Sequence, residues 1–198
     1  MPRVVDHEAR RAEIVNALLT IASSRGLHAA TSRAIAHELQ VATGALWHYF
    51  PNFNAVLGAA FAEVFARTNR RIDDQTTGLT GMRAIRAMMR EVLPTSAVTM
   101  TEAQLVVGYW GRVAIDDALA SHQLDLEREW RERLTGYLDQ AVSDGELITS
   151  TPVADVVDLL MSITSGQQVE AVLKPELPTI TSKSELLLDI CLRPWRAS

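Results

Sequence analysis

Residues 31–51 read TSRAIAHELQVATGALWHYFP, and this stretch decides the fold. Its first half predicts a short helix that Thr31 or Ser32 caps, with an apolar face at helical spacing. A second short helix is expected over residues 43–50 after a three-residue turn, and Pro51 ends it. Two short helices joined by such a turn are typical of a helix-turn-helix unit, which fits the major groove of duplex DNA.

The second short helix has the composition that a groove helix needs. Gly44 and Ala45 keep its leading end thin, and Thr43 offers a hydroxyl and a methyl group to base edges. Leu46 and Phe50 are expected to face inward as anchors. Three aromatic side chains with polar tips are expected to face outward: Trp47, His48 and Tyr49. Three alternatives stay open, namely that the aromatic run is packed core, that Trp47 is buried, and that His48 is a structural hydrogen bonder.

Amphipathic helices explain nearly every other segment, and no sustained strand alternation occurs. The first helix ends at Gly26, and a long helix that begins after Asn52 is expected to join two regions. Five further helices are expected at about 82–94, 96–120, 121–144, 151–173 and 182–192. The segment 96–120 is apolar nearly all round, which predicts a buried helix. The expected fold is all-α with about nine helices, in which residues 1–52 form a three-helix helix-turn-helix domain and residues 53–198 a second helical domain.

Charge and composition narrow the class of protein. The net charge of −5 divides into +1 for residues 1–50 and −6 for the remainder, which fits a DNA-binding head on an acidic body, although a random split would look the same. A single cysteine excludes an internal disulfide. The first residues lack a signal-peptide core, and the longest apolar stretch is too short to span a bilayer. We therefore expect a cytoplasmic protein without a membrane segment.

Metal binding and catalysis are poorly supported. His122 with Asp116 and Asp117 has no recognised ligand spacing, so no metal is expected. The sequence holds no Gly-rich phosphate loop and no nucleophile elbow, and its polar groups do not suggest a paired acid and base. We expect neither an enzyme nor a cofactor.

The motif resembles the TetR family of one-component regulators. The resemblance is carried by TSRAIA at 31–36, by VATGALWHYFP at 41–51 and by NAVL at 54–57, and it spans roughly residues 8–65. The pattern around Tyr109-Trp110, His122 and Gly145 is also faintly similar to the betaine-regulator (BetI-like) branch. The resemblance implies a ligand-responsive regulator, most often a repressor, that binds a palindromic operator in double-stranded DNA as a homodimer and responds to a small-molecule effector.

Carried over position by position, the resemblance implies a role for nine residues. Thr31 and Ser32 would cap the first short helix and touch phosphate, and Arg33 would contact phosphate or a base, unless it is simply solvated. Base edges would meet Thr43, Gly44 and Trp47. The DNA backbone would meet Ala45, His48 and Tyr49.

Four positions depart from the family pattern. Gln40 stands where a glycine is usual, and a left-handed non-glycine residue costs about 1–2 kcal/mol. Ala42 replaces a capping serine, Ala45 replaces a threonine, and Phe53 replaces a lysine that would face phosphate. We therefore expect weaker and more salt-tolerant DNA binding than is usual, which the first-helix arginines Arg3, Arg10 and Arg11 could offset.

The later helices are expected to hold an effector and to form a dimer. The candidate pocket residues combine soft apolar groups with a few polar ones, although each could equally be ordinary core: Phe61, Phe65, Met88, Met89, Met100, Gln104, Tyr109, Trp110, Arg112, Trp130, Met161 and Gln168. Arg112 could bind an anionic ligand or pair with Asp116. The last two helices carry apolar faces, and the family resemblance implies that these helices form a dimer interface: Val156, Leu160, Ile163, Leu186, Leu187 and Ile190.

A different class of function also fits the sequence. The unusual residues Gln40, Ala42 and Phe53, together with the low charge, suggest as an alternative a helical protein–protein adaptor that keeps a helix-turn-helix scaffold without binding DNA. A small-molecule enzyme on a helical body has little support.

Overall fold

The computed structural model describes residues 7–173 and 180–197. Within these ranges the chain is helical, and its one extended pairing is the isolated bridge between Leu147 and Arg196. The all-α prediction is therefore confirmed. The α-helices are α1 (His7–Arg25), α2 (Ser32–Glu38), α3 (Phe53–Thr76), α4 (Gly81–Val92), α5 (Ala97–Val113), α6 (Asp117–Ser143), α7 (Val153–Leu173) and α8 (Ile180–Leu192). Short 3-10 helices are η1 (Leu27–Ala29), η2 (Thr43–His48) and η3 (Arg193–Trp195).

The chain divides into two compact units. Unit 1 combines the described residues up to Phe65 with Gln104–His122, and unit 2 combines Ala66–Ala103 with the described residues from Gln123 onward. Helices α3, α5 and α6 each contribute residues to both units. The predicted domain boundary after residue 52 stays a prediction.

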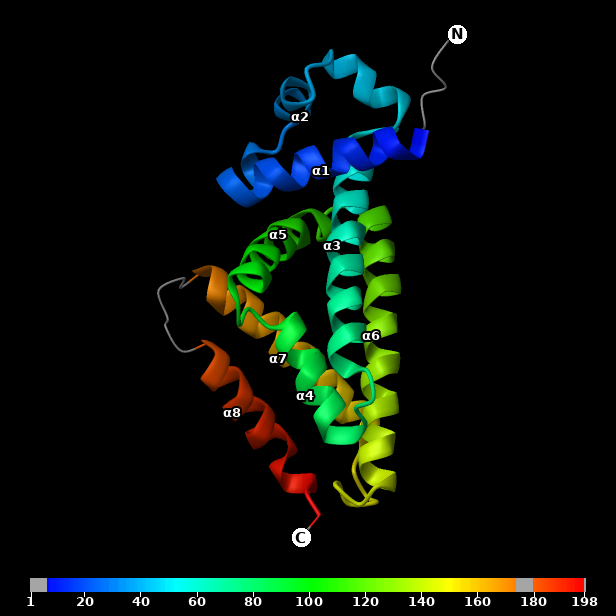
Figure 1. Ribbon diagram of the computed structural model, residues 1–198, viewed down its shortest axis with the longest axis vertical. Helices are drawn as coiled ribbons and strands as arrows, with labels where there is room; N and C mark the ends of the chain where they lie inside the picture. The colour runs from blue at the N-terminus through cyan, green and yellow to red at the C-terminus, as the bar shows by residue number, and fades with distance from the viewer. Residues whose placement is uncertain (1–6, 174–179, 198) are drawn as a thin grey trace. The chain divides into compact units, whose positions relative to one another are not determined.

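Unit 1 begins with a head made of α1, α2 and η2 (Figure 1). Helix α1 ends at Gly26, whose φ of 83° is the left-handed conformation that glycine adopts without strain. Helix α2 packs against both α1 and η2. Its predicted cap is confirmed, because Thr31 Oγ1 accepts a hydrogen bond from the N–H of Ala34 at 3.2 Å. The head has its own core, built from Ile14, Leu18, Ile21, Ile35, Leu46 and Phe50.

Helix α3 leaves the head at a side-chain cap. Asn52 Oδ1 accepts a hydrogen bond from the N–H of Ala55 at 2.9 Å, as the sequence predicts. Over its first three turns the helix buries an apolar stripe within unit 1: Val56, Leu57, Ala60, Phe61, Val64 and Phe65.

The helix predicted over residues 96–120 is in fact two helices, so this prediction was wrong. Helix α5 ends at Val113 and α6 begins at Asp117. Asp116 separates them because its Oδ1 accepts hydrogen bonds from the N–H groups of Ala118 and Leu119, at 3.1 and 3.0 Å, which caps α6. The segment is also not buried all round, since Val98 is 56% exposed.

Unit 2 has a separate apolar core. Its central residues come from α3, α4, α6, α7 and α8: Ile72, Ile85, Met88, Leu134, Leu138, Leu160 and Leu192. Helix α8 packs on α7. A polar tie crosses this core, because the buried Gln168 donates a hydrogen bond from Nε2 to the carbonyl of Val92 at 3.1 Å. Burying that amide without a partner would cost free energy, so the tie fixes α7 against the end of α4.

Candidate nucleic-acid interface

Helix η2 has one buried and one open side. Leu46 and Phe50 are each 1% exposed, whereas Trp47, which follows Leu46 directly, is 41% exposed. His48 is exposed as well. The predicted orientation is confirmed for these four residues, and the alternatives of a packed aromatic core and of a buried Trp47 do not hold. The exposed rings of Trp47 and His48, next to deeply buried anchors, form an outward-facing edge.

Tyr49 occupies an intermediate position at the end of η2. Its side chain is half-buried, and its ring centroid lies 4.9 Å from that of His7, with the two ring planes at 47°. The prediction that Tyr49 faces outward therefore holds only in part, because α1 covers one side of the ring.

The leading end of η2 is thin and open. A Cβ atom placed on Gly44 would meet nothing within 4 Å, and Gly44 is exposed. Thr43 and Ala45 on either side are half-buried. Ala42 holds the cap position in an extended conformation but makes no side-chain bond to the first turn. Another molecule can therefore approach the backbone of η2 closely, and the first N–H groups of η2 have no side-chain cap.

The start of α2 supplies the other predicted contacts. Thr31 and Arg33 are exposed, and Ser32 is half-buried. Because α2 packs on η2, all nine predicted DNA-contacting residues lie in the same small head, and none of them is buried. Their contacts with DNA remain predictions.

The turn between α2 and η2 contains a strained residue. Gln40 has a φ of 56° and is the one non-glycine residue with positive φ among the described residues. The departure from glycine noted in the sequence thus falls on a left-handed position, where a residue with a Cβ costs about 1–2 kcal/mol.

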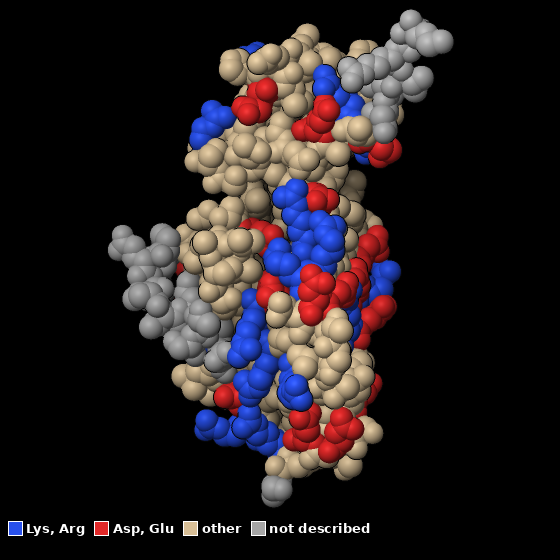
Figure 2. Space-filling view, viewed as in Figure 1, with Lys and Arg blue, Asp and Glu red and all other residues tan. Residues whose placement is uncertain are grey.

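Basic side chains are scarce around η2. The sequence has no Lys or Arg between Arg33 and Arg67. In Figure 2 the part of the surface over α2 and η2 is mostly neither basic nor acidic. Of the first-helix arginines, Arg10 pairs with Glu13, Arg11 donates to the carbonyl of Tyr49, and Arg3 lies outside the described residues. The sequence predicts that Arg10 and Arg11 compensate for the missing phosphate-binding cations. This compensation is weakened, because both side chains already have partners within the protein.

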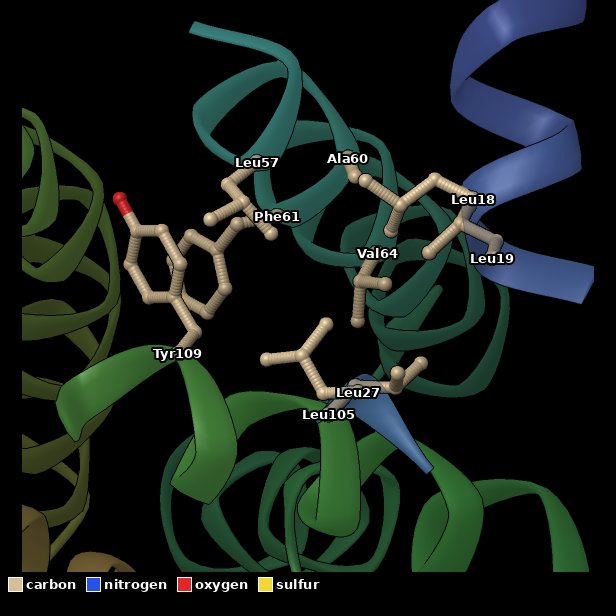
Figure 3. A pocket seen from close by; sticks show the side chains of 9 residues that line it. All are labelled: Leu18, Leu19, Leu27, Leu57, Ala60, Phe61, Val64, Leu105 and Tyr109. Carbon is tan, nitrogen blue, oxygen red and sulfur yellow. The ribbon is translucent and has the colours of Figure 1, made fainter. Parts of the chain in front are cut away.

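A small cavity lies within unit 1, between α1, η1, α3 and α5 (Figure 3). Its volume is about 20 Å³, which is room for roughly one water molecule. Its lining is apolar apart from one tyrosine: Leu18, Leu19, Leu27, Leu57, Ala60, Phe61, Val64, Leu105 and Tyr109. Phe61 and Tyr109 stack with their ring centroids 4.2 Å apart. Two of the predicted pocket residues are thus brought together, and the leucines around them were not singled out because such residues are usually ordinary core.

Tyr109 is the one polar group at this cavity. Its hydroxyl is buried and has no hydrogen-bond partner among the described residues, and in Figure 3 it points away from Leu27. Burial, and then the nearby charge of Asp116, raise the pKa of Tyr109. On the opposite wall Leu27 packs against α5, where a Cβ on Gly108 would lie 3.0 Å from Leu27 Cδ2.

The other predicted pocket residues are spread over the molecule. Most of those in unit 2 belong to its core, as the alternative interpretation held: Met88, Met89, Met161 and the partly buried Trp130. Phe65 and Gln168 are also buried, whereas Met100 and Trp110 are half-buried and Gln104 and Arg112 are exposed. Arg112 was predicted to pair with Asp116 or to bind an anion. The second carboxylate oxygen of Asp116 instead accepts from Asn54 Nδ2 at 2.5 Å, because Asp116 lies outside α5.

The predicted dimer residues fall into two groups. Val156 and Leu160 lie in the core of unit 2, at 1% and 0% exposure, so they are not surface residues. Ile163 and Leu187 are half-buried, and Leu186 and Ile190 are exposed. The large apolar side chains that α7 does expose are Leu159 and Leu173.

The described part of the chain places no three His, Cys, Asp or Glu side chains together in a way that could hold a metal ion. None of its helices combines the length and the apolar character needed to cross a membrane.

Comparison with known proteins gives matches over both parts of the chain. Residues 14–60 match the family profile described as "Bacterial regulatory proteins, tetR family", and residues 82–191 match "BetI-type transcriptional repressor, C-terminal". The chain is 28% identical over 179 residues to the HTH-type transcriptional regulator PksA of Bacillus subtilis, covering 88% of this chain and 84% of PksA. It is 31% identical to the HTH-type transcriptional repressor KstR of Rhodococcus jostii, covering 74% of this chain and 68% of KstR.

Solved structures show the same fold. The crystal structure of a transcriptional regulator from Rhodococcus sp. Rha1 superposes with a TM-score of 0.80 at 22% identity, covering 93% of this chain and 95% of that one.

Proposed function

Since this chain belongs to the TetR family of transcriptional regulators, we propose that it is a repressor that holds an inverted-repeat operator as a homodimer and that a small molecule controls its release. The alternative of a helical adaptor without DNA binding is not favoured by its relatives, which are named as transcriptional regulators and repressors.

One observation carries the proposal: η2 buries Leu46 and Phe50 while it exposes Trp47 and His48. The two buried anchors fix the rotation of the helix about its axis. The exposed pair, with the open backbone at Gly44, then forms an edge narrow enough for a major groove that admits one helix. We assign base reading to Thr43, Gly44 and Trp47. Backbone contacts are assigned to Thr31, Ser32, Arg33, Ala45, His48 and Tyr49.

The proposed dimer uses the exposed apolar side chains of α7 and α8. Leu159 is 38% exposed, Leu186 55% and Ile190 47%, and a second copy of the chain would bury all three. A two-fold axis through such a face places two heads on two half-sites, which is the reason to expect an inverted repeat. Val156 and Leu160 would support this face from the core.

The effector is proposed to act through the apolar contacts of unit 1. Helices α1, α3 and α5 meet at the cavity, so a ligand that moves α5 relative to α3 alters the support of α1 and thereby of the head. The cavity of about 20 Å³ is too small for a drug-sized ligand as it stands, and an effector must separate its walls. The stacked pair Phe61 and Tyr109 is the proposed contact, and an effector with an apolar face fits that pair best.

A gel-shift titration tests the proposal directly. Fragments of the source genome are titrated with the full chain at low salt, and the fragments retained first are used with two variants. Trp47→Ala is expected to lower affinity or change the preferred fragment. Ile115→Ala, which alters a side chain in unit 1 that is 79% exposed and lies outside the head, is expected to change neither. If the wild-type chain retains no fragment, the proposal is contradicted and the adaptor hypothesis is favoured instead.

A further inference from the structure

Arg11 ties α1 to the segment that leaves η2. Its Nη1 donates a hydrogen bond to the backbone carbonyl of Tyr49, 38 residues along the chain. Its guanidinium carbon lies 4.1 Å from the centroid of the Phe50 ring, within the range of a cation–π contact. One side chain therefore holds two consecutive residues, one through its backbone and the other through its ring.

Helix η2 is anchored by the buried Leu46 and Phe50, but local contacts that stabilise its two ends are few. It is a six-residue 3-10 helix, whose hydrogen-bond geometry is poorer than that of an α-helix. Ala42 gives it no side-chain cap, and the turn before it includes the strained Gln40. The N–H groups of Tyr49 and Phe50 both bond to the carbonyl of Leu46. Carbonyls at a helix C-terminus carry partial negative charge, so a guanidinium there is favourable.

These contacts with Tyr49 and Phe50 occupy the Arg11 guanidinium, which the sequence suggested for phosphate binding. Arg11 is half-buried, and its Nη1 and ring contact are directed into the head. Among the described residues of the head, the exposed arginines are Arg25 and Arg33. A phosphate contact by Arg11 would require it to leave Tyr49 and Phe50, which would release the end of η2.

We propose that Arg11 is a positioning residue for DNA reading: its guanidinium fixes the C-terminal end of η2 so that Trp47 and His48 face the groove, and it does not itself neutralise a phosphate. This inference rests on the proposed DNA-binding function. A positioning role and a phosphate-binding role differ in a measurable way. The slope of log affinity against log salt is negative, and each lost phosphate contact reduces the magnitude of that slope by about 0.9.

The first experiment measures that slope. Fluorescence anisotropy gives the affinity of the full chain for a labelled duplex retained in the genomic titration, at several KCl concentrations. Arg11→Ala is expected to weaken binding by up to about tenfold with the slope unchanged, because η2 must then be ordered on the DNA without a hydrogen bond that helps to fix it in the free protein. Arg11→Lys can still donate to the carbonyl of Tyr49 but lacks the flat guanidinium. Its affinity is expected to lie between those of the wild-type chain and Arg11→Ala. Arg33→Ala is the exposed control, whose slope falls if that residue meets phosphate.

If the magnitude of the slope fell by about 0.9 for each Arg11 replaced, the inference would be overturned. That result would leave the proposed DNA-binding function intact. Unchanged affinity in Arg11→Ala would overturn it as well. If the wild-type chain binds no duplex, the proposed function fails instead, and the two failures are thus distinguishable.

A second experiment needs no DNA. Hydrogen exchange at the amides of Tyr49 and Phe50 is compared between the wild-type chain and Arg11→Ala, a variant that removes both the hydrogen bond to Tyr49 and the contact with the Phe50 ring. Faster exchange at these two amides, with unchanged exchange in α7, supports a positioning role. Equal exchange in the two proteins contradicts it.

Discussion

Leu46 and Trp47 are neighbours in η2, yet the exposed fraction of the first is 1% and that of the second 41%. The pair therefore separates folding from function within one turn of helix. Leu46→Ala removes a buried side chain and should lower the free energy of unfolding by about 2–5 kcal/mol. Trp47→Ala should leave thermal unfolding nearly unchanged and alter DNA binding. Circular dichroism melts and gel shifts on both variants test this, and a large loss of stability in Trp47→Ala would show that the ring is structural.

The strained turn gives a second prediction. Gln40→Gly should raise the free energy of unfolding by about 1–2 kcal/mol, because glycine adopts a φ of 56° without the Cβ penalty. Gln40→Ala is the control, since it shortens the exposed side chain but keeps the Cβ, and it should change little. Denaturant titrations of the three proteins measure the difference. Equal stability of the glycine and alanine variants would mean that the turn relaxes in solution.

How much of this could be read from the sequence depends on the distance between the interacting residues. The cap at Thr31 and the inward anchors of η2 follow from local spacing, whereas the left-handed turn at Gln40 follows from the family resemblance, in which a glycine is usual at that position. The contact of Arg11 with Tyr49 joins residues 38 positions apart, and no local pattern encodes it. Local signals can also mislead: one of the two interpretations of Arg112 paired it with Asp116 within a single helix, whereas Asp116 caps the next helix.

Helix α7 shows a different limit. Its apolar residues surround much of the helix, so the periodicity does not say which side faces the core. Val156 and Leu160 were assigned to a dimer interface for that reason, and they lie in the core of unit 2 instead. The leucines that line the cavity of unit 1 were missed for a related reason, because a leucine beside a cavity and a leucine in packed core have the same sequence signature.

The carboxylate of Asp116 predicts a pH dependence. Hydrogen bonds from the N–H of Leu119 and from Asn54 hold its pKa below the ordinary value. A carboxyl group with a lowered pKa stabilises the folded state fully above its unfolded pKa of about 4, and this stabilisation is lost as the pH falls through the lowered value. Asp116→Asn should therefore be less stable than wild type at neutral pH and nearly equal to it in strong acid. Asp117→Asn, one residue further on, is the control for the loss of a charge, and urea titrations across this range measure all three.

The exposed residues of α8 predict the oligomeric state. Leu186→Glu and Ile190→Glu should convert the proposed dimer to a monomer without unfolding it, because both side chains are about half exposed in the isolated chain, at 55% and 47%. Leu124→Glu changes a leucine of α6 that is 63% exposed and should leave the dimer intact. Size-exclusion chromatography with light scattering distinguishes the two states. A wild-type chain that is monomeric at micromolar concentration would contradict the proposed dimer while leaving the head unaffected.

Selection from a pool of random DNA duplexes tests the central claim most directly. If the exposed edge of η2 reads the major groove, repeated rounds with the wild-type chain should enrich a short inverted repeat, and the same rounds with Trp47→Ala should enrich a different sequence or none. A pool that stays random with the folded wild-type chain, or one whose enriched sequence is identical for both proteins, would contradict it.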